Sequence, residues 1–494
     1  MQGATTGSIT PELLDKVFKS YDIRGKVGEL TEDFYYILGK VIAKYWGVDR
    51  PILIGHDARL SAEPLARILA ESFMQEGGTV WWVGLMPSEV RAFSLLKYPE
   101  LKGAIAVTAS HNPPEYIGAK LMENTNQDIL EYSKKQGYPQ IKQIFKQFLE
   151  HGVGLNSSDK ASDKTSVKRL SQNLQNLKDV QQQVMSDFKQ FVLGRLDVEK
   201  VASKKFKLVV DAGNGVAGVW FDYIFGDQDI FEYVPLYFEP DGNFPNHIAN
   251  PSHMENVMDA IEVVKSQNLD FGAVFDGDAD RIMFVDKKGR RPIGHIIGTM
   301  LAIDRLDKVG GGIVVQDVCL VFPSRYELPK HNGQVVIVPT GHVNVKNAMR
   351  QHNAVFGFEA SAHFLHPDIG HMDSGFLSFV RFLNVLASSN KTLEQHVDYY
   401  ESKYPYLPET NFVVEDRDLV LRKVEEHYKN TAKIDKTDGV AVEGPNWRFS
   451  VRKSNTEPVV RLFAEALDKP TLDTVVKGVT NLLKKFEDDA AGEE

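Results

Sequence analysis

The segment of this sequence that says most about the fold is Thr108-Ala109-Ser110-His111-Asn112-Pro113-Pro114. The apolar run Ala104 to Val107 comes directly before it and is typical of a buried strand. In open α/β sheets, ligands bind just beyond the carboxyl ends of the strands. The two prolines keep the loop from continuing as a helix. A serine in such a loop is more often a turn residue than a nucleophile, so other motifs must support a ligand site at Ser110.

A second loop, Asp276-Gly277-Asp278-Ala279-Asp280-Arg281, lies between two apolar runs. Gly277 permits the backbone turn that lets three carboxylates converge, and their hard oxygens suit Mg²⁺, Ca²⁺ or Mn²⁺. The pattern is not a calcium EF-hand loop, because Arg281 and Lys287 stand where that loop has glycine and glutamate. A solvated acidic turn is the alternative, but the apolar flanks are unusual surroundings for one. The sequence therefore predicts a metal loop.

Two further loops carry polar groups suited to a phosphorylated sugar. Gly357-Phe358-Glu359-Ala360-Ser361-Ala362-His363 follows an apolar run and offers donors and acceptors for sugar hydroxyls. Arg452-Lys453-Ser454-Asn455-Thr456-Glu457-Pro458, with Arg461 beyond it, offers guanidinium and small polar groups to a phosphate. Each of these two segments alone is equally consistent with a solvated loop or an ordinary turn.

In this order, the four segments resemble the α-D-phosphohexomutase family, which includes phosphoglucomutases and phosphomannomutases. The resemblance covers nearly the whole chain and includes the segments 21–25, 240–247 and 340–342. It implies three similar mixed α/β domains followed by a smaller α+β C-terminal domain, arranged around a central cleft.

The resemblance also implies a role for each motif. Ser110 is expected to be the phosphoserine, and Asp276, Asp278 and Asp280 are expected to hold Mg²⁺ against it. The other residues expected at the reacting groups are His111, Lys120, Arg281, Arg24 and His342. Either His111 or His342 relays the proton, and the sequence does not decide between them. The residues expected to bind substrate are Tyr21, Thr340, Gly341, Glu359, Ser361, His363, Arg452, Ser454, Asn455, Thr456 and Arg461.

The implied activity is the interconversion of hexose 1-phosphate and hexose 6-phosphate, with mannose or glucose as the sugar. It proceeds through a phosphoserine enzyme and a hexose 1,6-bisphosphate, which also serves as activator. The alternatives are a phosphoglucosamine mutase, a catalytically silent phosphosugar-binding relative and a simple phosphatase.

The composition is that of a globular protein without a membrane or nucleic-acid partner. The chain has 494 residues, a formal net charge of −10 and 43% hydrophobic residues, which argues against nucleic acid. No apolar run approaches the ~20 residues that span a bilayer, and the amino terminus lacks a signal-peptide pattern. The single cysteine, Cys319, excludes an intramolecular disulfide. We expect a cytoplasmic enzyme, with a monomer favoured over a small homo-oligomer.

The chain divides into four expected domains. Residues 1–178 carry the serine loop, 179–287 the metal loop, 288–404 the sugar loop and 405–494 the phosphate loop. Within the first, Thr31 to Tyr45 has the apolar stripe of an amphipathic helix, and the polar stretch 152–171 is expected to be a surface insertion or linker. At the carboxyl end, alternation in Val459 to Ala466 predicts a strand, and the apolar stripe that follows predicts a closing helix.

Two observations compete with this interpretation. Gly213-Asn214-Gly215-Val216-Ala217-Gly218 matches the dinucleotide fingerprint G-x-G-x-x-G, but a strand-to-helix turn also needs glycines for close packing, and we favour that explanation. Three positions depart from the family: Ile117 stands where asparagine is common, Cys319 where a substrate-contacting lysine is frequent, and Ala362 where many members have glycine. We expect these departures to affect sugar preference more than phosphoryl transfer.

Overall fold

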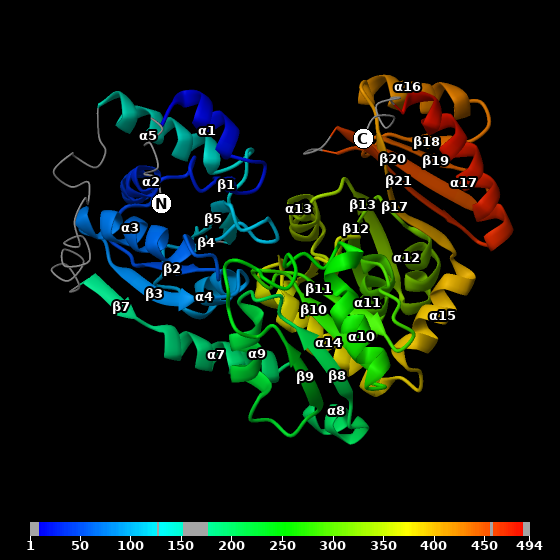
Figure 1. The fold of residues 1–494 in the computed structure, drawn as a ribbon, viewed down its shortest axis with the longest axis horizontal. Coiled ribbons are helices and arrows are strands. Elements are labelled where there is room, and N and C mark those ends of the chain that lie inside the picture. The colour runs from blue at the N-terminus through cyan, green and yellow to red at the C-terminus, as the bar shows by residue number, and fades with distance from the viewer. Residues whose placement is uncertain (1–8, 126–127, 152–175, 455–457, 488–494) are drawn as a thin grey trace. The chain divides into compact units, whose positions relative to one another are not determined.

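The computed structural model describes residues 9–125, 128–151, 176–454 and 458–487. The chain forms two compact units, residues 1–282 with 368–380 and residues 283–367 with 381–494 (Figure 1). The polar stretch 152–171 and the loop residues Asn455 and Thr456 lie outside the described residues. Within the described part of the chain, no helix is long and apolar enough to cross a membrane.

The first unit opens with a mixed sheet of strand order β1-β5-β4-β2-β3-β7, with β6 beside β5. Strands β2, β3, β4 and β7 are parallel, whereas β5 runs antiparallel to β4 and β1. The strand bounds are β1 Ile23–Lys26, β2 Ile52–His56, β3 Val80–Leu85, β4 Gly103–Val107, β5 Tyr116–Asn124, β6 Ile129–Glu131 and β7 Leu177–Asp179. The predicted strand before Ser110 is therefore confirmed as β4.

Helices cover both faces of this sheet (Figure 1). They are α1 Pro11–Val17, α2 Glu32–Trp46, α3 Ala62–Gln75, α4 Val90–Lys97 and α5 Tyr138–Glu150. The amphipathic helix predicted over Thr31 to Tyr45 is confirmed as α2, which ends at Gly47 with a φ of +79°. Its apolar stripe, including Phe34 and Leu38, is buried against α3, α5 and the sheet. Burying such a stripe is the main favourable term in forming this layer.

A second sheet in the same unit joins parallel strands β10, β8 and β9. Its strands and helices are α7 Gln181–Leu193, α8 Val198–Lys204, β8 Lys207–Asp211, α9 Ala217–Phe225, β9 Glu232–Leu236, the 3₁₀ turn η2 Met254–Val257, α10 Met258–Ser266 and β10 Phe271–Phe275. Strand β11, Ile282–Asp286, follows the aspartate loop. The aspartate loop thus joins two strands, as the sequence predicts.

The glycines of the dinucleotide-like motif pack against the chain itself. A Cβ on Gly215 would lie 2.7 Å from the carbonyl oxygen of Gly277, and one on Gly218 would lie 2.4 Å from the backbone of Phe238. Gly213 adopts a φ of +53° in the turn after β8, a conformation that favours glycine. Backbone conformation or close packing therefore accounts for each glycine, in agreement with the structural explanation of the motif.

The second unit begins with a sheet of strand order β13-β12-β14-β15, in which β12 is parallel to both neighbours and β15 is antiparallel to β14. The elements along this stretch of the chain are α11 Gly294–Val309, β12 Gly312–Asp317, α12 Phe322–Glu327, η3 Leu328–His331, β13 Gly333–Val338, α13 His342–His352, β14 Phe356–Phe358, β15 Phe364–His366, η4 Pro367–Ile369, β16 Met372–Asp373, α14 Gly375–Ser388 and α15 Leu393–Lys403. Within it, residues 368–380, which include β16 and the start of α14, belong to the first unit.

The C-terminal part is an antiparallel sheet of order β17-β21-β20-β19-β18, with two helices packed on its apolar face (Figure 1). Its elements are β17 Tyr406–Val413, α16 Arg417–Tyr428, β18 Lys433–Asp435, β19 Val440–Glu443, β20 Trp447–Lys453, β21 Val459–Ala466, α17 Lys469–Leu483 and η5 Lys484–Phe486. The predicted strand and closing helix are confirmed as β21 and α17. Pro408 lies on the edge strand β17, where a missing N–H costs little. The domain limits given above stay a prediction.

Candidate active site

The serine loop places the hydroxyl of Ser110 among polar groups in a buried setting. Ser110 comes three residues after the end of β4, is 4% exposed and has a φ of +50°. Its amide donates to Thr108 Oγ1 at 2.8 Å. Its Oγ lies 3.1 Å from Nδ1 of His111 and 3.2 Å from Oδ2 of Asp276. A left-handed backbone at a non-glycine residue costs about 1–2 kcal/mol, so the loop holds Ser110 in this conformation through its other contacts.

Arg59, which the sequence reasoning missed, supplies many of those contacts. The guanidinium donates to the carbonyl oxygens of Ser110 at 2.8 Å, Asn112 at 2.6 Å and Pro113 at 2.6 Å. Its Nε donates to Asp57 at 3.0 Å, and Asp57 in turn accepts from Thr108 Oγ1 at 2.7 Å. A buried ion pair therefore fixes the backbone around the hydroxyl. The signal available in the sequence was a charged pair, Asp57 and Arg59, directly after the apolar run of β2.

The three aspartates of the metal loop converge in the same unit. One carboxylate oxygen from each of Asp276, Asp278 and Asp280 lies within 4.8 Å of the others, and all three residues are buried. Burial, with the negative charge of Asp280, raises the pKa of Asp276 above its usual value. Oδ1 of Asp278 is buried and has no hydrogen-bond partner among the described residues. Buried polar atoms normally have partners, so this oxygen is available to a cation.

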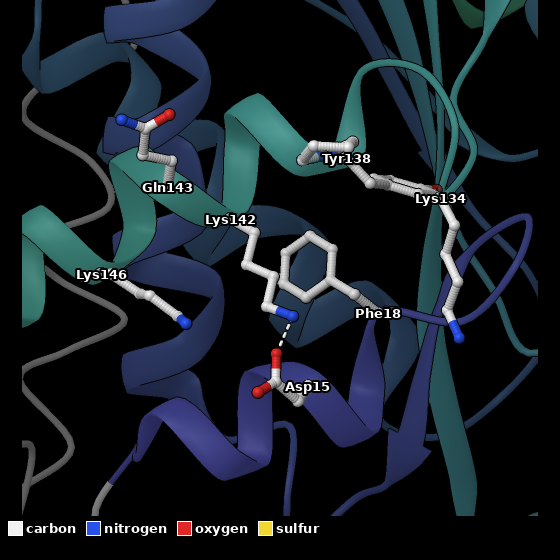
Figure 2. A pocket seen from close by; sticks show the side chains of 8 residues that line it. Asp15, Phe18, Lys134, Tyr138, Lys142, Gln143 and Lys146 are labelled. Atoms are coloured by element: carbon white, nitrogen blue, oxygen red, sulfur yellow. Dashed lines mark ion pairs between the residues drawn. The ribbon is translucent and has the colours of Figure 1, made fainter.

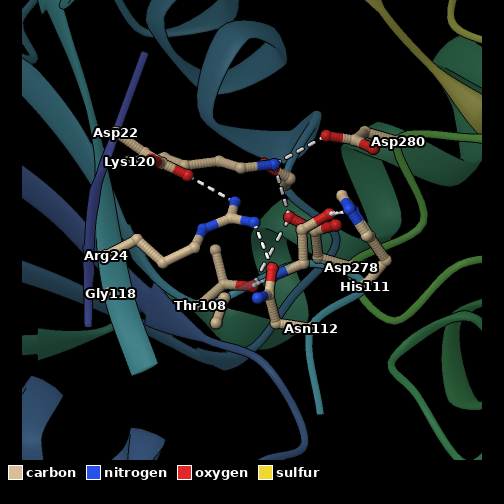
Figure 3. A network of polar contacts seen from close by, with 12 residues as sticks. Asp22, Arg24, Thr108, His111, Asn112, Gly118, Lys120, Asp278 and Asp280 are labelled. Carbon is tan, nitrogen blue, oxygen red and sulfur yellow. Dashed lines mark hydrogen bonds and ion pairs between the residues drawn. The ribbon is translucent and has the colours of Figure 1, made fainter. Parts of the chain in front are cut away.

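Two cations flank the triad. Lys120, on β5, donates to Asp278 at 2.7 Å and to Asp280 at 2.6 Å (Figure 3). Burial alone would lower the pKa of Lys120, but these two carboxylates raise it above its usual value. Arg281 contacts Asp276 at 2.9 Å through Nε and Ser252 at 3.1 Å. The three carboxylates outnumber the two cations that contact them here, and this arrangement suits a further cation of the hard type.

Arg24 and Tyr21 come from the N-terminal segment. Arg24 lies on β1, where its guanidinium donates to Asp22 and to the side chain of Asn112 (Figure 3). Tyr21 lies in the bend before β1 and is partly exposed. The structure thus places Ser110, His111, Lys120, Arg281, Arg24 and the three aspartates in one connected polar network.

The sugar loop of the second unit forms its own polar cluster. Oε1 of Glu359 accepts from the amide of Gly341 at 2.6 Å, and its Oε2 lies 3.1 Å from Nδ1 of His363. The same imidazole nitrogen lies 2.8 Å from Oγ of Ser361. The rings of His342 and His363 are 5.1 Å apart. The loop therefore joins the predicted residues Glu359, Ser361 and His363 to the Thr340-Gly341-His342 segment at the start of α13.

A buried carboxylate that the sequence reasoning missed supports this loop. Asp317, at the end of β12, accepts from the amide of Ala360 at 3.1 Å and from His295 Nε2 at 2.7 Å. Burial opposes its ionisation, but His295 holds the pKa of Asp317 below its usual value. Thr340 is similarly tied by its amide and hydroxyl to Asp438 at 3.1 and 2.6 Å. No local sequence pattern points to Asp317 or Asp438, because the loop residues that they contact, Ala360 and Thr340, are distant from them along the chain.

The phosphate loop presents two arginines side by side. Arg452 on β20 pairs in register with Arg461 on β21, and like charges directly opposite each other repel. Glu409 lies 3.6 Å from Arg452 and 3.0 Å from Arg461. Nε of Arg452 is buried without a partner among the described residues. Ser454 is buried, and its carbonyl accepts from Arg417 at 2.7 Å. Two guanidiniums held side by side form a site suited to an anion.

Ala362, Cys319 and Ile117, the three unusual positions noted in the sequence, have local structural explanations. Ala362 is buried and adopts a φ of +65°, so the sugar loop uses a conformation that favours glycine. Cys319 is buried beside Leu320 and Phe463, and burial raises the pKa of its thiol well above the usual value. Ile117 is fully buried on β5. Cys319 and Ile117 therefore act as core side chains.

The pocket between α1 and α5 has none of these groups (Figure 2). Its volume of about 530 Å³ lies in the range of ligand sites. Its walls include Phe18, Lys134 and Lys142, and Lys142 pairs there with Asp15. No residue predicted for substrate, metal or catalysis lines it, so size alone does not locate the site.

Comparison with known proteins agrees with this geometry. Family models match all four parts: phosphoglucomutase/phosphomannomutase alpha/beta/alpha domain I over residues 15–148, domain II over 186–289, domain III over 294–404 and the C-terminal domain over 409–482. The phosphohexose mutases of Xanthomonas campestris pv. campestris (strain B100) are 34% identical over 472 residues, covering 94% of this chain and 99% of the relative. The phosphomannomutase of Methanocaldococcus jannaschii is 32% identical, with 95% and 98% covered.

A solved structure, the phosphoglucomutase/phosphomannomutase family protein of Burkholderia thailandensis, matches with a TM-score of 0.76 and 27% identity. The match covers 97% of this chain and 98% of that one. Four domain models in order and relatives above 30% identity across almost the full length lead to one conclusion. The chain belongs to the phosphoglucomutase/phosphomannomutase family.

Proposed function

We propose that this enzyme, an isomerase that moves phosphate within a sugar, interconverts hexose 1-phosphate and hexose 6-phosphate with mannose, glucose or both as the sugar. The observation that carries the proposal is the position of Ser110. Its Oγ lies 3.1 Å from His111 and 3.2 Å from Asp276, in a loop whose backbone is fixed by a buried arginine. A phosphoserine at this point, formed and consumed through a hexose 1,6-bisphosphate, accounts for a hydroxyl held between an imidazole and an acidic triad.

The residues present fit a divalent metal, and Mg²⁺ is the ion we propose. Asp276, Asp278 and Asp280 would hold it, together with an oxygen of the phosphorylated Ser110. The three residues offer only carboxylate oxygens, as Mg²⁺ prefers, and Oδ1 of Asp278 has no other partner among the described residues. A phosphoserine adds about −1.5 to −2 charges at neutral pH. When bound, the ion would neutralise that charge and draw electron density from phosphorus.

Most of the side chains proposed for the transfer step belong to the first unit. The bond between phosphorus and Ser110 Oγ breaks while a sugar hydroxyl oxygen bonds to phosphorus, and the hydroxyl proton passes to a base. Transfer back from the other phosphate of the bisphosphate regenerates the phosphoserine. Lys120, Arg281 and Arg24 are proposed to stabilise charge on the phosphoryl oxygens. His111 is within reach of Ser110 Oγ, and His342 stays the alternative proton relay.

The second unit is proposed to bind the rest of the substrate. Arg452 and Arg461, with Ser454 and the loop residues that follow, would bind the phosphate that is not being transferred. Glu359, Ser361 and His363 would contact sugar hydroxyls. Because two guanidiniums lie side by side here, with Glu409 near both, a dianionic phosphate is a better partner for the arginine pair than a neutral sugar.

A coupled assay tests the proposal and its alternatives. The purified enzyme would be given glucose 1-phosphate, mannose 1-phosphate or glucosamine 1-phosphate, with hexose 1,6-bisphosphate and Mg²⁺ present. Formation of the 6-phosphate from the first two supports the proposal. Turnover of glucosamine 1-phosphate alone indicates a phosphoglucosamine mutase, release of inorganic phosphate without isomer indicates a phosphatase, and binding without turnover indicates a silent relative.

The remaining assignments are proposals from composition. A single cysteine suits a reducing compartment, so we place the enzyme in the cytoplasm. A monomer is proposed as the working unit, with a small homo-oligomer as the alternative.

A further inference from the structure

Glu89 is a buried carboxylate that connects two helix starts behind the metal loop. It lies at the beginning of α4 and is 2% exposed. Its Oε2 accepts from the hydroxyl of Ser374, and its Oε1 accepts from the amide of Phe376 at 3.2 Å. Ser374 Oγ also accepts from the amide of Leu377 at 3.0 Å in the first turn of α14. The carboxylate thus links segments 285 residues apart in the sequence, both within the first unit.

The neighbours of these contacts hold the backbone of the metal loop. The amide of Ser88, directly before Glu89, donates to the carbonyl of Asp278 at 2.8 Å. The amide of Gly375, directly after Ser374, donates to the carbonyl of Ala279 at 3.2 Å. A Cβ on Gly375 would lie 2.5 Å from that carbonyl oxygen, so only glycine allows the approach. Two successive carbonyls of the metal loop are therefore held by residues adjacent to the Glu89 contact.

The consequence is a fixed spacing between the two amides. Ala279 lies at the tip of the loop with a φ of +60°, a conformation that needs outside support in a non-glycine residue. If the contact between Glu89 and Ser374 is lost, the amides of Ser88 and Gly375 are no longer held at one separation. Asp278 and Asp280 flank Ala279 in the sequence. A change in the separation of the two amides therefore changes the spacing of the two carboxylates. Affinity for a divalent ion depends on such spacing.

We propose that Glu89 is a positioning residue for the metal loop: it sets the separation of the carboxylates and thereby the affinity for a divalent cation. The inference rests on the proposed metal site and goes beyond it, because Glu89 touches neither the ion nor the substrate. Loss of a residue that orients metal ligands typically weakens metal binding roughly ten- to a hundred-fold.

The test is an equilibrium titration of the full chain with Mn²⁺, which stands in for Mg²⁺. Electron paramagnetic resonance measures how much Mn²⁺ is bound. Glu89→Gln keeps the size of the side chain but replaces one acceptor oxygen with a donor. We expect it to raise the Kd for Mn²⁺ about tenfold, with turnover partly restored at high Mg²⁺. Ser374→Ala removes only the hydroxyl donor and should raise the Kd for Mn²⁺ by a smaller factor. It is the variant to measure if Glu89→Gln does not fold.

Asp187→Asn is the matched control. Asp187 accepts from the hydroxyl of Tyr98 at 2.6 Å, at the opposite end of α4, so its loss perturbs the same helix away from the metal loop. We expect a lower thermal midpoint with an unchanged Kd for Mn²⁺. If Glu89→Gln and Ser374→Ala both bind Mn²⁺ as the wild type does, the role of Glu89 is refuted while the metal site stands. If the wild type itself binds no divalent ion, the metal site and this inference both fall.

Discussion

A Cβ on Gly277 would lie 2.7 Å from the carbonyl oxygen of Ser110. The serine loop and the metal loop therefore touch through their backbones at a point where any side chain would separate them. This contact places Ser110 Oγ within 3.2 Å of Asp276.

Gly277→Ala is expected to push the two loops apart and lower kcat roughly 100-fold, since a 1 Å misplacement of reacting groups costs about that much. Steady-state kinetics with hexose 1-phosphate and excess hexose 1,6-bisphosphate would measure this kcat. Gly28→Ala is the control, because a Cβ there meets nothing within 4 Å. Equal kcat values for the two variants would show that the backbone contact does not set the reacting geometry.

Arg59→Met should destabilise the serine loop and lower activity together. It removes the contacts to four backbone carbonyls and leaves Asp57 buried without its cation, and breaking a buried ion pair costs about 3–5 kcal/mol. Thermal unfolding should show a clearly lower midpoint. Lys423→Gln, which removes an exposed pair with Glu426, should stay within about 0.5 kcal/mol of the wild type. An Arg59→Met enzyme with wild-type midpoint and kcat would contradict the role of Arg59.

The pH dependence of stability should reveal His247. Its Nε2 lies 3.1 Å from Asp211 and its Nδ1 lies 3.0 Å from the carbonyl of Ile248, so both nitrogens face acceptors. Burial opposes the charge, but Asp211 raises the pKa of His247. A group with a raised folded-state pKa contributes stability below its unfolded pKa, about 6.5, and loses that contribution as the pH rises through the folded value.

His247→Asn should therefore lower the thermal midpoint more at pH ~6 than at pH ~9. Differential scanning calorimetry of both proteins at the two pH values gives the comparison. If His247→Asn lowers the thermal midpoint by the same amount at both pH values, His247 is neutral in the folded protein.

Arg452→Ala should raise KM for the phosphosugar about ten- to a hundred-fold, because it removes a charge-assisted contact of about 1.5–3 kcal/mol. The control is Lys453→Ala at the next residue along the chain. The side chain of Lys453 is half-exposed and pairs with Asp418, so this variant should leave KM nearly unchanged. If the two variants have the same KM, the arginine pair does not bind the distal phosphate.

The sequence was sufficient for the features that are local. Ser110 and the aspartates stand directly after apolar strands, so their place at the end of a sheet follows from residues a few positions away. Arg59 and Glu89 were not predictable in this way, because they contact Ser110 and Ser374 across 51 and 285 residues. Several of their partners are backbone carbonyls and amides, which leave no mark on residue type. The residues around Gly277 likewise predict only a turn, because its close approach to Ser110 joins two loops that are distant along the chain.

The central claim, that Ser110 carries the phosphoryl group, is tested most directly by intact-mass measurement after incubation with hexose 1,6-bisphosphate and Mg²⁺. The wild type should gain one phosphoryl group, located on Ser110 by peptide mapping, and Ser110→Ala should gain none and lose nearly all turnover while keeping its fold. A Ser110→Ala enzyme that is still phosphorylated, or that turns over at the wild-type rate, would contradict the account.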